Sequence, residues 1–257
     1  MFYPVINKDL VDHLAHPDRY KGDAASPRGD RPSASRAQRL TQGWTSLRLV
    51  MLICCVLSLL QPSLLLAASD PAEPATARLV VVGDSLSAAY NMPENQGWVS
   101  LLADRLAEQA PHWQVINASI SGDTSANGLN RLPFLLRQHQ PQLVLIELGG
   151  NDGLRGLPTA RIEQQLERMI LLTQEANAQP LLIGIQIPPN YGSRYSEEFR
   201  QVFSRLAERY QLPFVPFLLE GIADQPHLMQ ADGIHPTAEA QPHILELVWL
   251  ELAPLLD

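Results

Sequence analysis

Cysteine and lysine are almost absent from most of this 257-residue chain. Its two cysteines, Cys54 and Cys55, are adjacent, and no lysine follows Lys21. Residues 70–257 therefore hold no disulfide, and a core of apolar side chains must stabilise them. The same stretch carries 11 arginines against 22 acidic residues. Because phosphate binding needs clustered basic side chains, we expect no nucleic-acid partner.

A single long apolar stretch divides the chain. Residues 49–60 and 64–68 are nearly all apolar, with Pro62 between them and Arg48 ahead of them. A basic flank, a short apolar core and small residues at its exit are typical of a secretory signal. We expect cleavage near Ala67, which would make the remaining protein periplasmic or secreted. The alternative is an uncleaved membrane anchor, because residues 49–68 approach the roughly 20 needed to span a bilayer.

The segment ahead of this stretch is longer than the few residues that normally precede a signal core. Residues 24–42 are rich in Arg, Ser, Asp and Pro, a composition typical of disorder. We interpret residues 1–48 as a disordered basic extension, which a wrongly assigned start codon would explain. The expected division is therefore an extension at 1–48, a signal peptide at 49–69 and one domain at 70–257.

From residue 77 onward, apolar runs alternate with amphipathic segments. Strands that alternate with helices are typical of an α/β protein with a parallel sheet and helices on both faces. The expected strands are residues 78–82, 114–117, 143–148, 181–187 and 214–216, and the expected helices are 98–109, 125–138, 159–177, 197–210 and 238–255.

The serine at the end of the first expected strand is the first candidate for chemistry. Gly83-Asp84-Ser85 follows the apolar run 79–82, and the chain beyond it resembles the start of a helix. A hydroxyl at such a place lies near backbone N–H groups that favour negative charge. Serine is also a common helix N-cap, so the interpretation of Ser85 depends on partner residues.

Three further strand ends supply such partners. The second expected strand leads to Gly122, the third to Asn151, and the fifth to Asp232 and His235. Ser85 is the candidate nucleophile, with His235 as its base and Asp232 orienting the imidazole. The N–H groups of Ser85 and Gly122 and the side-chain amide of Asn151 are the candidate oxyanion donors. The alternative is that these residues only shape turns.

Other polar residues near these motifs have structural explanations. We interpret Asp84 and Asp152 as residues that support turns. Glu147 lies in an expected buried strand, where a carboxyl group needs hydrogen-bond partners. We interpret it as a hydrogen-bonded core residue, with a role in tuning the site as the alternative. No spacing of histidine and acidic residues indicates a metal site.

Four blocks of the sequence, in this order, resemble the signature blocks of the SGNH/GDSL hydrolases. They are Gly83-Asp84-Ser85-Leu86, Ser121-Gly122-Asp123, Gly149-Gly150-Asn151-Asp152 and Asp232-Gly233-Ile234-His235. The resemblance runs from about residue 77 to the C-terminus and is nearest the exported bacterial acyl-CoA thioesterase I, lysophospholipase and arylesterase branch. It implies a three-layer, flavodoxin-like α/β/α sandwich with strand order 2-1-3-4-5. It also implies hydrolysis through an acyl-enzyme without a metal or an organic cofactor. Ala89 departs from the glycine of many relatives, and we expect this change to affect packing more than chemistry.

Two segments are expected to give the site an apolar wall. The resemblance suggests that residues 154–158 line an acyl pocket and move with the acyl chain, whereas simple packing is the alternative. The candidate substrate-binding residues are Leu154, Leu157, Ile187, Pro188, Pro189 and Tyr191.

Together these features predict an exported serine hydrolase, which we take to be a monomer by default because no feature of the sequence indicates an oligomer. We expect it to cleave the carboxylic ester and thioester bonds of small acyl esters or lysolipids, and to contact the membrane only through an uncleaved signal segment. One alternative is a carbohydrate-deacetylating esterase, which would use the same groups but which the apolar wall disfavours. The other is a non-catalytic module that binds acyl chains or lipids, against which the complete set of candidate groups argues.

Overall fold

The structure, a computed structural model, describes residues 76–256. The expected extension at 1–48 and signal peptide at 49–69 lie outside the described residues. Within residues 76–256, no helix combines the length and the apolar character needed to cross a membrane.

Five strands and six α-helices follow one another in the described part of the chain. The strands are β1 (Ala77–Gly83), β2 (Trp113–Asn117), β3 (Leu143–Glu147), β4 (Gln179–Ile183) and β5 (Phe214–Val215). The α-helices are α2 (Trp98–Gln109), α3 (Ser125–His139), α4 (Gly150–Leu154), α5 (Thr159–Glu175), α6 (Ser193–Tyr210) and α7 (Gln241–Leu252). Short 3₁₀ segments cover Glu94–Gln96, Pro189–Tyr191, Pro226–Leu228, Ala238–Ala240 and Ala253–Leu255.

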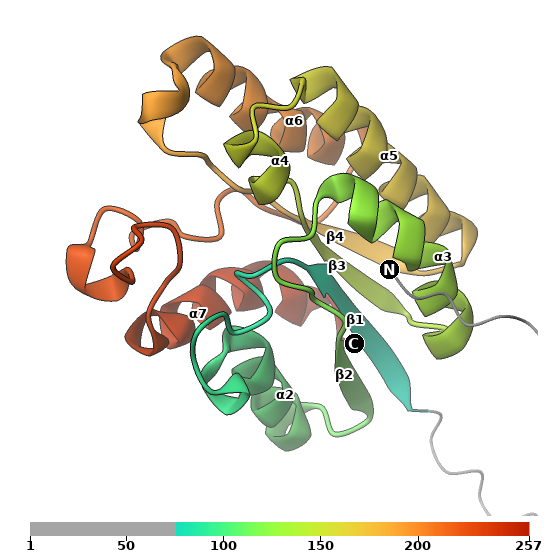
Figure 1. Cartoon of the computed structure of the whole chain (residues 1–257). Helices are drawn as coiled ribbons and strands as arrows, with labels where there is room; N and C mark the ends of the chain where they lie inside the picture. Colours follow the sequence, from blue (N-terminus) through green and yellow to red (C-terminus); the bar gives the residue numbers. More distant parts are fainter. Residues whose placement is uncertain (1–75, 257) are drawn as a thin grey trace, which may run out of the picture. The chain divides into compact units, whose positions relative to one another are not determined.

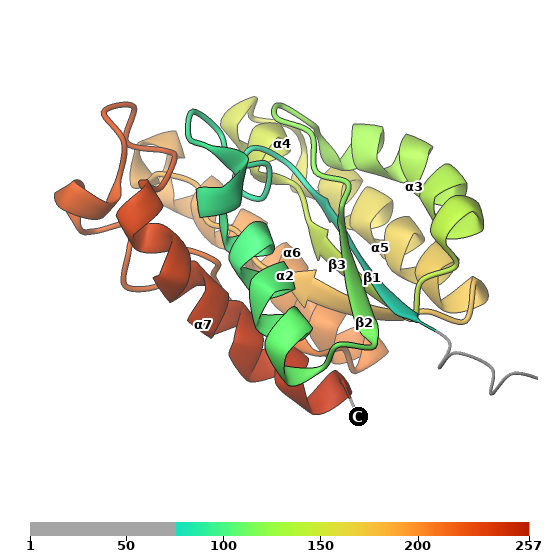
Figure 2. The same cartoon turned by 90° about the horizontal axis from the view of Figure 1, so that it is seen from below.

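The five strands form one parallel sheet in the order β2-β1-β3-β4-β5. Helices α2 and α7 cover one face of the sheet, and α3, α5 and α6 cover the other (Figures 1 and 2). The expected three-layer α/β/α fold and strand order are therefore confirmed. A parallel sheet brings the carboxyl ends of its strands to one edge, which is where ligands bind in open α/β folds.

The alternation of side chains along β1 divides the core in two. Leu79 and Val81 pack with α2 and α7, whereas Val80 and Val82 pack with α3, α5 and α6. All four side chains are fully buried. Burial of each side chain stabilises the fold by about 1.5–3 kcal/mol relative to leaving it exposed. Packing on both faces of the sheet thus fixes β1, from which the Ser85 loop continues.

The chain beyond Ser85 forms a series of turns instead of the expected helix. One helical turn begins, since the N–H of Ala88 donates to the carbonyl of Asp84 at 3.0 Å. Ala89 and Asn91 then adopt left-handed backbone angles, with φ of 53° and 56°. Such angles interrupt the hydrogen-bond pattern of a right-handed helix, so the chain turns away before α2.

The fourth strand is shorter than the expected 181–187, because the chain leaves the sheet at Gly184. A Cβ atom at Gly184 would lie 2.3 Å from the carbonyl oxygen of Pro216, so only glycine permits this approach of two backbones. The N–H of Gly184 donates to Val215 at 2.7 Å, and its carbonyl accepts from Leu218 at 2.9 Å. Ile185 and Ile187 remain buried beyond this point without belonging to a strand.

Candidate active site

Ser85, His235 and Asp232 form a chain of hydrogen bonds at the carboxyl edge of the sheet. The Nε2 atom of His235 lies 2.8 Å from the hydroxyl oxygen of Ser85. The Nδ1 atom of His235 lies 2.7 Å from Oδ2 of Asp232. The Tyr90 ring packs beside the imidazole, with 4.2 Å between the ring centres. The structure thus brings together three residues that the sequence spreads over 150 positions.

Asp232 is held in its charged form by the turn that contains it. Its Oδ1 atom accepts the N–H groups of Ile234 and His235, both at 3.0 Å. Partial burial opposes ionisation, but these hydrogen bonds and the imidazole outweigh it and lower the pKa of Asp232 to about 2. An ionised Asp232 accepts a proton-bearing Nδ1, which leaves the lone pair of Nε2 directed at the Ser85 hydroxyl.

Two of the three expected oxyanion donors have no protein acceptor in the described part of the chain. The backbone N–H groups of Ser85 and Gly122 make no hydrogen bond there, and both residues line the same pocket. Gly122 has a φ of +84°, and nothing lies within 4 Å of the position that a Cβ atom would take. A polar ligand atom in the pocket could therefore accept from both groups.

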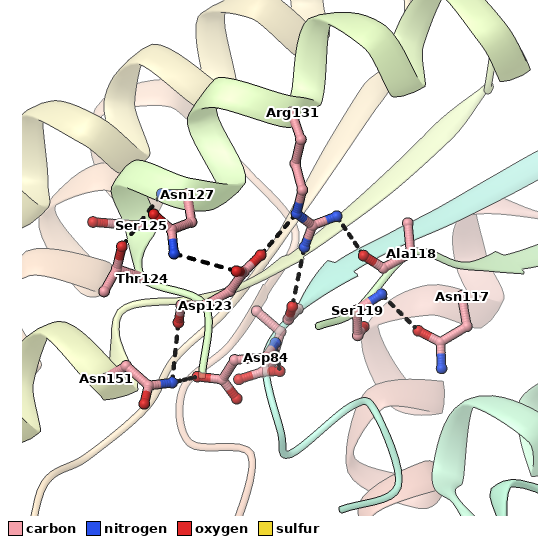
Figure 3. A network of polar contacts seen from close by, with 12 residues as sticks. Asp84, Asn117, Ala118, Ser119, Asp123, Thr124, Ser125, Asn127, Arg131 and Asn151 are labelled. Atoms are coloured by element: carbon pink, nitrogen blue, oxygen red, sulfur yellow. Dashed lines mark hydrogen bonds and ion pairs between the residues drawn. The ribbon is translucent and has the colours of Figure 1, made fainter. Parts of the chain in front are cut away.

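Asn151, the third expected donor, is already engaged. Its Nδ2 atom donates to Oδ2 of Asp84 and to the backbone carbonyl of Asp123, each at 3.0 Å (Figure 3). An amide nitrogen has two hydrogens, so both are donated in this arrangement. Asn151 must release one of these acceptors before it can donate to a ligand.

Two buried carboxyl groups lie behind the Ser85 turn. Asp84 accepts the N–H of Leu86 at 3.0 Å, and burial raises the pKa of Asp84 to about 6 in spite of this hydrogen bond. Glu147 is fully buried, and its Oε2 atom accepts the N–H of Asp84 at 3.2 Å and the hydroxyl of Ser87 at 2.7 Å. Burial, together with the neighbouring Asp84, raises the pKa of Glu147 well above its usual range. Glu147 is thus a hydrogen-bonded core residue in direct contact with the turn.

Ser85, Gly122, Asn151 and His235 line a cavity of about 560 Å³, and most of its lining is apolar. Leu154, Ile187 and Pro188 line it as expected, whereas Leu157 and Tyr191 are not among its lining residues. Leu157 instead packs on the core beside α5 and α6. The side chain of Pro189, which was also expected in the wall, lies outside the described part of the structure.

Sequence reasoning missed part of the lining of this cavity and two residues that make hydrogen bonds to the loops of the site. Phe217, Leu219 and Met229 belong to this part of the lining, and their apolar character in the irregular segment after β5 was the available signal. Arg131 and Gln230 make hydrogen bonds to the loops that carry Gly122 and His235. Neither lies in a recognisable motif, so no sequence signal distinguished them.

The arrangement suits acyl transfer. A hydroxyl in contact with an imidazole, an ionised carboxylate behind that imidazole and two unpaired N–H groups are what such a reaction needs. Within residues 76–256, no three histidine, cysteine or acidic side chains come close enough to hold a metal ion.

Comparison with known proteins finds relatives whose names describe acyl-ester hydrolysis. Residues 81–241 match the model of the GDSL-like lipase/acylhydrolase family. Esterase TesA of Pseudomonas aeruginosa is 53% identical over 184 residues, which cover 72% of this chain and 92% of that protein. Thioesterase 1/protease 1/lysophospholipase L1 of Escherichia coli K12 is 48% identical over 179 residues, covering 70% and 85%.

A solved structure agrees with these relatives. Esterase EstA from Pseudoalteromonas sp., inhibited by monoethylphosphonate, is 43% identical, with a TM-score of 0.66 over 70% of this chain and 98% of that one. The match thus extends over nearly the whole length of a protein of the same fold. The chain belongs to the GDSL-like lipase/acylhydrolase family.

Proposed function

We propose that this protein is a serine esterase that hydrolyses carboxylic ester and thioester bonds through an acyl-enzyme, with Ser85 as the nucleophile. The observation that carries the proposal is the hydrogen-bonded chain from Ser85 through His235 to Asp232, beside two unpaired N–H groups in an apolar cavity. The names of the relatives, an esterase and a thioesterase/lysophospholipase, agree with this chemistry.

The first half of the reaction acylates the serine. The Ser85 oxygen attacks the carbonyl carbon and forms a C–O bond, while its proton passes to Nε2 of His235. The carbonyl oxygen becomes an oxyanion that accepts the N–H groups of Ser85 and Gly122. The carbon–oxygen or carbon–sulfur bond to the leaving group then breaks, and His235 returns the proton to the departing alcohol or thiol.

The second half uses water. His235 takes a proton from a water molecule, which attacks the acyl carbon and regenerates the same oxyanion. Collapse of this intermediate breaks the bond to Ser85, whose oxygen recovers the proton from His235, and releases the carboxylic acid. Asp232 keeps its negative charge throughout and stabilises the imidazolium in both halves. For Asn151 to serve as a third donor, Nδ2 would leave Asp84 or the Asp123 carbonyl.

The apolar cavity supports small acyl esters and lysolipids as substrates. The lining side chains of Leu154, Ile187, Phe217 and Met229 offer contacts to an alkyl or aryl group. A carbohydrate substrate would need more polar partners than this lining supplies. We further propose that the protein acts as a monomer after export directed by residues 49–69.

The test uses p-nitrophenyl esters of increasing acyl length, an acyl thioester and a lysophospholipid. We expect wild-type turnover of the short and medium esters, and a loss of about 10⁴-fold or more in kcat for Ser85→Ala. An alkyl fluorophosphonate should label the wild-type protein at Ser85 and leave the variant unlabelled. Absence of both turnover and label in the wild-type protein would contradict the proposed function.

A further inference from the structure

Arg131 contacts three segments that meet at the site, although it lies outside the cavity. Its side chain projects from α3 and is 19% exposed. Nε donates to Oδ2 of Asp123 at 2.8 Å, Nη2 donates to the carbonyl of Gly83 at 3.2 Å, and Nη1 donates to the carbonyl of Ala118 (Figure 3). Gly83 ends β1, Ala118 follows β2, and Asp123 begins the approach to α3. One guanidinium therefore joins three separate pieces of backbone.

Two of these pieces carry the backbone oxyanion donors. Gly83 stands two residues before Ser85, and Asp123 directly follows Gly122. The carbonyl of Asp123 also accepts from the side chain of Asn151 at 3.0 Å. The N–H groups of Ser85 and Gly122 thus lie on segments that the guanidinium holds, and Asn151 contacts one of these segments.

Gly122 is held by a small number of polar contacts. Nothing lies within 4 Å of its would-be Cβ position, and its carbonyl accepts one hydrogen bond, from Nη2 of Arg155 at 3.3 Å. Backbone hydrogen bonds run from Ile120 to Gly83 and from Asp123 to Ile120, both at 3.1 Å. The ion pair between Arg131 and Asp123 connects this loop to α3, from which Asn127 also donates to Oδ1 of Asp123 at 3.3 Å.

The helix that carries Arg131 lies close against the sheet. A Cβ atom at Gly128 would lie 2.1 Å from Cδ1 of Leu148, so this glycine lets α3 approach the end of β3. Thr124 caps the helix by accepting the N–H of Asn127 at 3.3 Å. Arg131 follows Gly128 by about one turn on the same helix face, so its side chain starts from a fixed base near the sheet edge.

We propose that Arg131 is a positioning residue for the oxyanion hole, which holds the segments of Ser85 and Gly122 at the spacing that the transition state requires. The inference rests on the proposed esterase function. Three acceptors at separate places need the planar, forked donor set of arginine. The ammonium of a lysine is a single point and cannot reach all three.

The test compares Arg131→Lys and Arg131→Met with wild type on a p-nitrophenyl ester. We expect kcat to fall by ~10–100-fold in both variants, somewhat less than the loss of a whole oxyanion donor, with KM within about twofold of wild type. Retention of positive charge in the lysine variant separates positioning from simple charge stabilisation. Arg137→Met on the same helix is the matched control, because Arg137 is exposed and makes no side-chain hydrogen bond within residues 76–256.

A second readout is one that a purely structural role would not change. An alkyl trifluoromethyl ketone adds reversibly to a nucleophilic serine and places an oxyanion in the hole, whereas the matching alkyl methyl ether fills the same space without one. We expect the inhibition constant of the ketone to rise by the same factor by which kcat/KM falls, and that of the ether to stay unchanged. Thermal unfolding followed by circular dichroism identifies a temperature at which every variant is folded, and all assays are run there. If Arg131→Met does not fold, the comparison of Arg131→Lys with wild type tests the inference.

The inference would be overturned if Arg131→Lys kept kcat within twofold of the Arg137→Met control. It would also be overturned if ketone and ether weakened equally. Both results leave the esterase function intact, since wild type would still turn over ester in a Ser85-dependent way. Absence of that turnover in wild type would instead overturn the esterase function and this inference together.

Discussion

The buried carboxyl group of Glu147 makes the stability of the fold depend on pH. In the unfolded chain its carboxyl group ionises near pH 4.5, whereas burial keeps it protonated far above that pH in the folded protein. Below the unfolded-state pKa, both the folded and the unfolded protein hold this proton, so the Glu147 carboxyl group does not reduce the stability of the fold. As the pH rises above about 4.5, the unfolded state loses the proton and the folded state does not, so the stability of the fold falls.

Replacement of Glu147 by glutamine should remove this dependence. The amide oxygen can keep the hydrogen bonds from Asp84 and Ser87, and the amide does not titrate. We expect the unfolding free energy of Glu147→Gln, relative to wild type, to increase as the pH rises above 4.5, by up to about 1.4 kcal/mol per pH unit. Urea unfolding at several pH values measures it.

Glu108→Gln offers the matched control, since it makes the same change of residue type at an exposed position. A constant difference between Glu147→Gln and wild type across this range would show that Glu147 ionises in the folded protein. It would thereby contradict the burial argument.

At this scale the sequence located the residues that the structure brings together in the candidate site, but it did not predict the hydrogen bonds that Asn151 makes there. Ser85, Gly122, Asn151 and His235 each follow a strand end, which is a local signal that a parallel sheet makes interpretable. The double donation by Asn151 depends on how Asp84 and the Asp123 carbonyl approach it after folding. No pattern within the sequence encodes that approach.

At the scale of elements, Gln230 joins two segments that are far apart in sequence. Its Nε2 atom donates to the carbonyls of Tyr90 and Pro236 at 3.1 and 3.0 Å, and its Oε1 atom accepts from Asn91 at 3.1 Å. In the described part of the chain, one further hydrogen bond joins residues 84–92 to residues 229–236, and it is the bond between Ser85 and His235. Gln230 therefore fixes the distance between the serine segment and the histidine turn.

Truncation of this side chain should loosen that distance. For Gln230→Ala we expect kcat to fall roughly tenfold with little change in KM, because a small misplacement of the base slows proton transfer more than it weakens binding. Gln225→Ala is the control, since the Gln225 side chain donates only to Gly221 within its own loop. Steady-state kinetics on one ester measure both. Equal kcat values for the two variants would contradict the role given to Gln230.

The elements themselves were predictable where a pattern is local. Alternating apolar runs located all five strands and the five long helices. Their ends were less predictable, because they depend on contacts made after folding. Gly184 ends β4 through its approach to Pro216, and the left-handed angle at Ala89 prevents a helix after Ser85.

At the scale of the whole molecule, residues 76–256 lie within one compact unit. Two apolar clusters, one on each face of the sheet, account for its interior. We expect residues 70–257 expressed alone to unfold in a single transition, with equal calorimetric and van't Hoff enthalpies.

The same protein should keep the kcat of the full-length chain and melt at the same temperature with or without a reducing agent, because residues 70–257 contain no cysteine. Differential scanning calorimetry and ester turnover provide the measurements. Two transitions would show that residues 70–257 do not unfold as one cooperative unit. A loss of activity on removal of residues 1–69 would mean that the active domain extends further towards the N-terminus.

The backbone contact at Gly184 has a consequence for how this protein can diversify. The segments that follow β4 and β5 both contribute to the lining of the cavity, with Ile185 and Ile187 from the first and Phe217 and Leu219 from the second. The hydrogen bonds of Gly184 join these two segments, and any side chain at residue 184 would push their backbones apart. Adaptation to new substrates must therefore proceed through the lining side chains, which can change in size without moving the two backbones.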